Sequence, residues 1–209
     1  MAPDDIRYWS FSVGELETNA YLVYSFASRV CLVIDPGAES DELTYFIANE
    51  KLRPAMIVLT HGHGDHNGGV KSLLEQFPMP LLIHRLDEPM LQSPYNLDFS
   101  SMLNLPPPPP ADRLIEDGDI LEAADIRLKV IHTPGHTPGS VTLQLDDWLF
   151  TGDTLFAEDV GRTDLPGGDP DAQRQSLEKL KLFPPDTLVL PGHGQADTMK
   201  DILIQNPYL

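Results

Sequence analysis

The sequence is 209 residues long, with 41% hydrophobic and 22% charged residues, which is ordinary for a globular protein. No apolar run approaches the roughly 18 residues of a membrane span, so we expect no membrane partner. The 32 acidic and 14 basic residues give a formal net charge of -18. That balance argues against a nucleic-acid partner, because phosphates require a basic surface. The length suits one domain over residues 1–209.

The N-terminus and the cysteine content indicate a compartment. Asp4 and Asp5 stand where a secretory signal peptide would be basic, and no apolar segment follows them. Cys31 is the only cysteine, so no intramolecular disulfide can form. Its place in the apolar run "RVCLVID" predicts a buried, unreactive thiol. We therefore expect an unprocessed cytoplasmic protein.

The first half of the chain alternates strand and helix signals. Strands are predicted for the runs "RYWSFSV", "AYLVYS" and "VCLVIDPG". Ser40 begins a helix with apolar residues on one face, and the wholly apolar run 55–59 predicts a buried strand. From Val70, apolar residues recur at i, i+3, i+4 and i+7, which predicts a helix that Pro78 ends. Residues 80–84 predict a further strand.

Residues 93–111 form a proline-rich insertion, "SPYNLDFSSMLNLPPPPPA". Its five consecutive prolines cannot join a sheet and predict a polyproline II segment without regular structure. Long loops of this kind are often functional, so the insertion is either a wall of the active-site cleft or a surface excursion.

The second half is mostly strand-like. Residues 126–130 and 141–145 alternate apolar and polar side chains, so we expect each strand to have one face in solvent. A tight turn then leads to a strand at 148–152, a helix at 171–182, a strand at 187–190 and a short helical tail. The runs "IVLTHGHG" and "LVLPGHG" resemble each other and hint at two similar halves. Two packed sheets with helices outside would accommodate this order.

The stretch "THGHGDH" concentrates metal-binding residue types. His61, His63 and Asp65 have the i, i+2, i+4 spacing that places side chains on one side of an extended chain. The glycines between them are expected to let the backbone bend around a small central object. Asp65 and His66 then begin a helix. An N-cap role would explain Asp65 but not the histidines beside it.

Three further candidate ligands follow predicted strands. They are His136 in "HTPGHTPGS", Asp153 in "LFTGDTLF" and His193 in "LVLPGHG". Strand ends hold side chains rigidly while loops give access. Five histidines and two aspartates are too many ligands for one tetrahedral zinc and suit two metals. The remaining histidines, His84 and His132, are expected to have structural or supporting roles, His132 more so because of its proximity to His136.

Together these motifs resemble the metallo-β-lactamase superfamily of hydrolases over nearly the whole chain. Within it, the motifs "GDTLF", "GRTDLPGGD" and "NPYL" are most similar to compact glyoxalase II-like, or hydroxyacylglutathione hydrolase-like, proteins. The resemblance implies an α/β fold, a four-layer αββα sandwich, with all seven ligands in one cleft.

The resemblance also implies two metal sites. His61, His63 and His136 would hold the first metal, Asp65, His66 and His193 would hold the second, and Asp153 would bridge them. Asp65 and Asp153 would be catalytic, and a hydroxide bridging the metals would be the nucleophile. Two divalent ions are expected, zinc foremost, and iron or manganese also suit this donor set.

Some features depart from the glyoxalase II pattern. Only residues 194–209 follow the last ligand, so the helical C-terminal domain that binds glutathione is not expected. Gln195 stands where those enzymes carry a tyrosine. Arg162 matches a basic residue nine positions after the bridging aspartate. It either meets a substrate carboxylate or pairs with Asp164 or Asp159.

Several functions remain open. The first is hydrolysis of a small-molecule thioester such as S-lactoylglutathione. The alternatives are a mononuclear-iron persulfide dioxygenase, a lactone or other ester hydrolase, and a protein that stores metal. Lactamases that ligate metal through cysteine are disfavoured because Cys31 lies in an unrelated strand, and the acidic charge disfavours a nuclease. The sequence predicts no oligomeric state.

Overall fold

The structure is a computed structural model that describes residues 5–209. Asp4, which contributed to the expectation of no signal peptide, lies outside the described residues. Among residues 5–209, no helix is long and apolar enough to cross a membrane.

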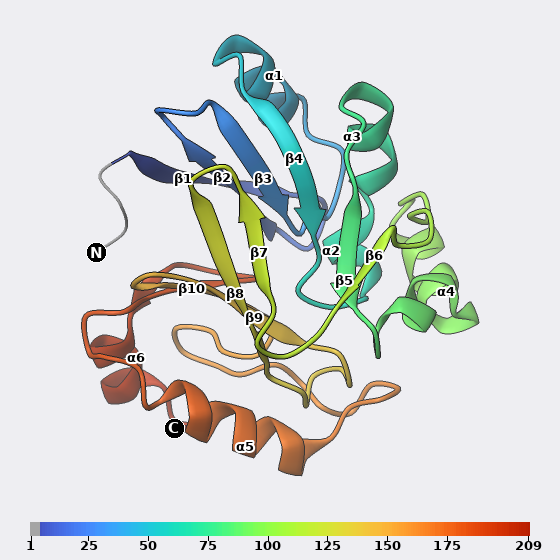
Figure 1. Ribbon diagram of the computed structural model, residues 1–209. Coiled ribbons are helices and arrows are strands. Elements are labelled where there is room, and N and C mark those ends of the chain that lie inside the picture. The colour runs from blue at the N-terminus through green and yellow to red at the C-terminus, as the bar shows by residue number, and fades with distance from the viewer. Residues whose placement is uncertain (1–4) are drawn as a thin grey trace.

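Two six-stranded sheets form the centre of the molecule (Figure 1). In spatial order, the first sheet consists of β1 (Ile6–Val13), β2 (Thr18–Ser25), β3 (Val30–Ile34), β4 (Arg53–Val58), β5 (Leu81–His84) and β6 (Arg113–Ile115). The second consists of β12 (Asp197–Thr198), β11 (Leu188–Pro191), β10 (Trp148–Gly152), β9 (Val141–Leu145), β8 (Ile126–His132) and β7 (Ile120–Ala123). Each sheet uses one half of the chain, which agrees with the weak internal repeat.

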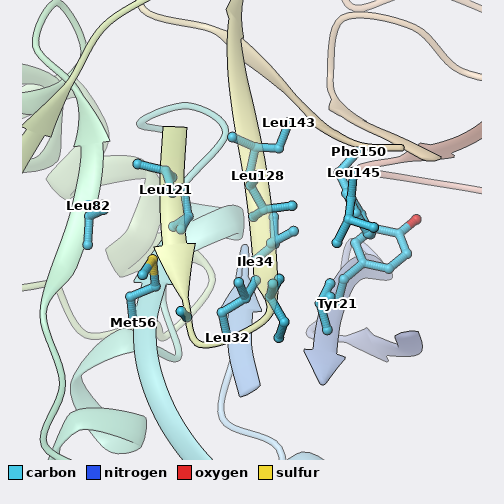
Figure 2. Packing of buried hydrophobic residues seen from close by; sticks show 14 of the residues in the cluster. Tyr21, Leu32, Ile34, Met56, Leu82, Leu121, Leu128, Leu143, Leu145 and Phe150 are labelled. Carbon is cyan, nitrogen blue, oxygen red and sulfur yellow. The ribbon is translucent and has the colours of Figure 1, made fainter. Parts of the chain in front are cut away.

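The inner faces of the sheets pack against each other. Figure 2 shows this core, in which side chains of the first sheet meet side chains of the second. From the first sheet it labels Tyr21, Leu32, Ile34, Met56 and Leu82, and from the second Leu121, Leu128, Leu143, Leu145 and Phe150. Burial of this apolar surface is the main favourable contribution to folding.

Helices cover both outer faces. The helical segments are α1 (Asp41–Asn49), α2 (Gly64–Asn67), α3 (Val70–Gln76), the 3-10 helix η1 (Glu88–Gln92), α4 (Pro94–Met102), α5 (Pro170–Leu180) and α6 (Met199–Gln205). Apolar residues of α1 and α3 pack on the outer face of the first sheet. Those of α5 and α6 pack on the second (Figure 1). The layers are therefore α, β, β and α, which confirms the predicted sandwich.

The expectation for the insertion was wrong in part. Residues 94–102 form α4, where irregular structure was predicted. Ser93 caps this helix by accepting a hydrogen bond from Asn96 N at 3.2 Å, and Pro94 occupies its first turn. A capping serine followed by proline is a helix-start signal, which the run of prolines downstream obscured. Residues 106–110 lie outside any helix or strand, as predicted.

The expectation of a solvent face was also wrong for β9. Its residues are buried except Gln144, which is half-buried. Thr142, which suggested a polar face, is fully buried and its hydroxyl lies 3.2 Å from that of Thr133. A buried hydroxyl with a partner costs little, so threonine here does not mark solvent exposure. In β8, by contrast, Arg127 and Lys129 are exposed as expected.

Candidate metal centre

Seven histidine and aspartate side chains meet beyond the ends of four strands. They are His61 and His63 after β4, Asp65 and His66 in α2, His136 between β8 and β9, Asp153 after β10 and His193 after β11. Every residue predicted as a ligand therefore lies in this cluster. In the first sheet, β4 runs parallel to β3 and leads into the segment of His61. In the second sheet, β10 and β11 run parallel, so Asp153 and His193 follow neighbouring strand ends.

The first group consists of His61, His63 and His136, which are all buried. One ligand atom from each lies within 4.8 Å of the others, and His63 Nδ1 is 2.9 Å from His136 Nε2. The Nε2 atoms of His61 and His63 are buried without any hydrogen-bond partner. Buried polar atoms are rarely left unpaired, so unpaired nitrogens in a group whose ligand atoms converge favour a bound ion.

The second group consists of Asp65, His66 and His193, with ligand atoms again within 4.8 Å of one another. His66 Nε2 lies 3.2 Å from His193 Nε2, and Asp65 Oδ2 lies 3.4 Å from His193 Nε2. His193 is the most exposed candidate ligand of the cluster, with 27% of its side chain accessible. The second group is therefore the more exposed of the two.

Asp153 lies between the two groups. Its Oδ1 is 3.3 Å from His66 Nε2, and its Oδ2 is 3.6 Å from His136 Nε2. Oδ1 therefore faces the second group, and Oδ2, which also lies 3.7 Å from His193 Nε2, stands between the two groups. That is the arrangement expected of a residue that bridges two cations.

Hydrogen bonds on the far side of the rings fix their orientation. His136 Nδ1 lies 2.8 Å from the carbonyl oxygen of Arg162, and His193 Nδ1 lies 3.0 Å from that of Leu16. A carbonyl only accepts, so each Nδ1 donates this hydrogen bond and each Nε2 is the nitrogen that faces the centre. These contacts orient both rings so that Nε2 would be the atom that binds a metal.

Asp35 is a supporting residue that sequence reasoning missed. It directly follows β3, is buried, and accepts hydrogen bonds from Thr60 N at 2.7 Å and Thr60 Oγ1 at 2.5 Å. Its Oδ2 lies 3.0 Å from His66 Nδ1. Like Asp153, it is an acid directly after an apolar strand, in "VIDPG", and that signal could have found it.

Asp87 was also missed. Its carboxylate accepts hydrogen bonds from Gly62 N at 3.0 Å, Gly139 N at 2.6 Å and Thr137 Oγ1 at 2.6 Å. It therefore ties the segment carrying His61 to the loop carrying His136. Burial raises the pKa of Asp87, and the three donors act in the opposite direction. No local sequence pattern marked this residue.

Glycine is required at positions 62 and 64 of the histidine motif for a different reason from the one expected. Neither Gly62 nor Gly64 has a positive φ, so backbone bending does not require them. A Cβ on Gly62 would lie 2.9 Å from Met90 Cβ, and a Cβ on Gly64 would collide with Ser100 Oγ. Glycine is needed here because η1 and α4 pack directly against the ligand segment.

Charges in the cluster suit metal binding. Burial lowers the pKa of His61 well below its usual range, and burial together with His136 lowers that of His63 to about 4. Both rings are therefore neutral at pH 7, the form that binds metal. Burial opposes a charge on His66, but Asp153 and Asp65 outweigh it and raise its pKa well above the usual range. Asp153 and Asp65 thus favour positive charge beside His66, which a divalent cation would supply.

A cavity of about 330 Å³ opens over the cluster. Four of the candidate ligands line it, together with Leu16, Tyr95, Phe99, Arg162 and Leu165. Arg162 is exposed and pairs with Asp164 through two bonds of 2.7 and 2.8 Å. The pairing of Arg162 with Asp164, which was the alternative to a substrate-binding role, is therefore present. The Arg162 side chain also lines the cavity.

His84 and His132 lie outside the cluster, as expected. Their rings stack at 4.3 Å with an interplanar angle of 13°. His132 Nε2 lies 2.8 Å from the carbonyl oxygen of Pro138, two residues beyond His136. The pair therefore supports the loop that carries a candidate ligand.

The fold and the site agree with comparisons to known proteins. The family model described as metallo-beta-lactamase superfamily matches residues 13–193, and the chain belongs to this superfamily of metallo-hydrolases. The probable metallo-hydrolase YqgX of Bacillus subtilis is 37% identical over 209 residues, 98% of each chain. A hydroxyacylglutathione hydrolase of Salmonella paratyphi A is 36% identical over 182 residues, which cover 87% of this chain but 64% of that enzyme.

Solved structures share the whole architecture. BLEG-1, a B3 metallo-β-lactamase, has a TM-score of 0.90 and 34% identity, covering 97% of this chain and 99% of that one. TTHA1623 in a di-iron-bound form has a TM-score of 0.86 and 37% identity, covering 96% and 100%. ETHE1 from Myxococcus xanthus has a TM-score of 0.79 and 26% identity, covering 96% and 83%. The similarity to glyoxalase II is thus partial, and that to smaller metallo-hydrolases extends over the full chain.

Proposed function

We propose that this chain is a hydrolase that uses two divalent metal ions, zinc foremost, to cleave thioesters such as S-lactoylglutathione. The observation that carries the proposal is the position of Asp153, whose carboxylate lies 3.3–3.7 Å from histidine nitrogens of both groups of candidate ligands. His61, His63 and His136 would hold one ion, and Asp65, His66 and His193 the other. Iron and manganese also suit these donors, and a related protein binds two irons.

The chain's own residues prepare this chemistry. When bound, two such ions would lower the pKa of a water molecule to about 7 and polarise the substrate carbonyl. Burial raises the pKa of Asp65 and of Asp153, but the facing histidines outweigh it and lower both. Both carboxylates are therefore ionised at neutral pH, and Asp65, which lines the cavity, can orient the attacking water through a hydrogen bond.

The cavity lining favours a thiolate as the leaving group. Besides the proposed ligands, the described lining offers proton donors only on Arg162 and Tyr95, which are both exposed. An amine or alkoxide requires a proton as it leaves. A thiol, with an ordinary pKa near 8.5, departs as the anion at little cost. This difference supports thioesters over oxygen esters and amides.

Two other activities have support from specific observations. The group His61, His63 and His136 is buried and complete without His193, so one iron could bind there alone, as in a persulfide dioxygenase. The likeness to BLEG-1 over nearly the full chain favours a test of β-lactams and lactones. A persulfide dioxygenase would consume oxygen, whereas cleavage of a lactone or β-lactam would open a ring without oxygen.

One experiment separates these functions. The protein, purified without added metal and then loaded with zinc, iron or manganese, is assayed on S-lactoylglutathione, an acetyl thioester, a lactone and a β-lactam, with oxygen uptake recorded on a persulfide. We expect about two metals per chain and thiol release without oxygen uptake. One iron per chain with oxygen uptake, and no thiol release, would contradict the proposal.

A further inference from the structure

The cavity over the metal cluster has an apolar wall. Leu16, Tyr95, Phe99 and Leu165 line it together with the candidate ligands. Leu16 and Tyr95 remain 45% and 41% exposed although they stand beside charged groups. Apolar side chains from separate segments that surround one polar centre are typical of a site for a small ligand.

The wall is fixed to the ligand segment. Tyr95 and Phe99 belong to α4, and Asn96 of the same helix donates a hydrogen bond to the carbonyl oxygen of Gly62 at 3.0 Å. Ser100 fills the space over Gly64. Because α4 contacts the histidine motif on both sides of His63, its aromatic residues hold a set position relative to the reacting atoms.

Away from the proposed metal sites, the cavity lining offers little positive charge for an anionic substrate group. A second cavity of about 480 Å³ is lined by Glu158 and Asp159, and its lining includes no lysine or arginine of the described chain, only the proposed ligand His193. In the first cavity, the single cationic side chain outside the proposed ligands is Arg162, whose charge Asp164 already offsets. A group with two carboxylates would therefore meet little compensation on either side.

We propose that the substrate carries an apolar alkyl or aryl group next to its scissile bond, and that Tyr95 and Phe99 select this group. The inference rests on the proposed function for the reaction, thioester cleavage. It narrows the substrates to thioesters less polar than S-lactoylglutathione, whose lactoyl group carries a hydroxyl and whose thiol part carries two carboxylates. Transferring the group from water to the aromatic wall stabilises its complex, whereas a small acetyl group leaves the wall unused.

Equilibrium binding tests the inference without turnover. Acetate and phenylacetate, which share a carboxylate and differ by one aryl group, are titrated into the zinc-loaded protein by calorimetry. We expect phenylacetate to bind about tenfold more tightly than acetate, since a modest hydrophobic contact discriminates by this order. In Phe99→Ala the ratio should fall toward one, and Tyr95→Ala, at an exposed position, provides a second variant if the first folds poorly.

Phe26→Ala is the matched control. Phe26 is 54% exposed and directly follows Ser25, the last residue of β2. The other end of β2, Thr18, is the end that pairs with His193 at the cluster. The variant should keep the wild-type ratio. Equal binding of the two acids by the wild type, or an unchanged ratio in both Phe99→Ala and Tyr95→Ala, would overturn the inference. Thiol release from acetyl and phenylacetyl thioesters of one thiol is measured in parallel; its absence would contradict the proposed function, while the binding ratio still decides the inference.

Discussion

Asp153 is the residue on which the two-metal arrangement depends. Its oxygens face both groups, and its negative charge offsets the repulsion between two cations about 3.5–4 Å apart. We expect Asp153→Ala to lose at least one equivalent of metal and to lower kcat on thioesters by orders of magnitude. Asp153→Asn keeps the shape without the charge, so it should lie closer to Ala than to wild type. Atomic absorption and thiol release on the purified variants provide the measurement.

His193→Ala is the comparison for this prediction. It removes a ligand from the exposed group only, so the buried group of His61, His63 and His136 should retain its metal. Two metals per chain and near-normal turnover in Asp153→Ala would show that the carboxylate does not bridge.

Asp35 acts on the centre through His66. In Asp35→Asn, the charge that orients the His66 ring is lost while the side-chain size is kept. Supporting residues of this kind typically contribute about 10–100-fold in metal affinity. We expect a loss of that size for one of the two metals, measured by competition with a chromophoric chelator. Asp125→Asn, at an exposed carboxylate bonded to Ser25 and Ser28, is the control; equal affinities in all three proteins would contradict the assigned role.

His84 should contribute to the pH dependence of stability. Burial, with a smaller contribution from His132, lowers its pKa to about 4, against about 6.5 in the unfolded chain. Between these values the unfolded chain binds more protons, so the free energy of unfolding falls as pH drops from 6.5 to 4. Allowing for solvent near the ring, this amounts to roughly 1–2 kcal/mol. Urea titrations across this range should show a smaller decrease for His84→Phe than for wild type, and parallel curves would refute the prediction.

Among single residues, the sequence was sufficient to predict the cluster where metal-binding residue types stand at recognisable positions, after a strand or in a dense motif. The seven candidate ligands each follow an apolar strand or lie in the dense histidine motif, so residue type and spacing were enough to group them. Asp35 and Asp87 were missed because their role comes from contacts to segments 25 or more positions away, to Thr60 in one case and to Gly139 in the other. Spacing along the chain carries no record of such contacts.

At the scale of elements, α4 and the histidine motif depend on each other. A Cβ on Gly64 would collide with Ser100 Oγ. We expect Gly64→Ala to destabilise the fold by about 1–3 kcal/mol, as overpacking does. Ser100→Gly should restore part of this loss in the double variant, which thermal or urea unfolding measures. Additive effects of the two substitutions would mean that α4 does not press on the motif.

The helices and strands were predicted correctly where the spacing of apolar residues fitted only one type of secondary structure. α1 begins after Ser40, whose hydroxyl accepts a hydrogen bond from Leu43 N at 3.2 Å, and Leu43 and Ile47 are buried as the pattern required. α4 and the burial of β9 were not predicted, because proline and threonine suggested irregular or exposed structure. The prolines that follow α4 obscured its helix-start signal, and in β9 the burial of Thr142 with a hydroxyl partner outweighed the local pattern.

At the scale of the whole molecule, three apolar clusters support the fold independently of the metal cluster. One lies between the sheets and the others lie beneath the helices on each side. Chelation should therefore leave the far-ultraviolet circular dichroism spectrum nearly unchanged. The Tm should fall by roughly 10 °C, because metal at about 1,000 times its Kd adds about 4 kcal/mol of stability. Loss of the folded spectrum on chelation would show that the metals are required for folding.

The central claim is that two cations share Asp153. A crystal structure of the metal-loaded protein, with anomalous scattering recorded at the metal edge, tests it most directly. We expect two peaks, one among His61, His63 and His136 and one among Asp65, His66 and His193, both within bonding distance of the Asp153 carboxylate. A single peak, or two peaks of which only one contacts Asp153, would contradict the account.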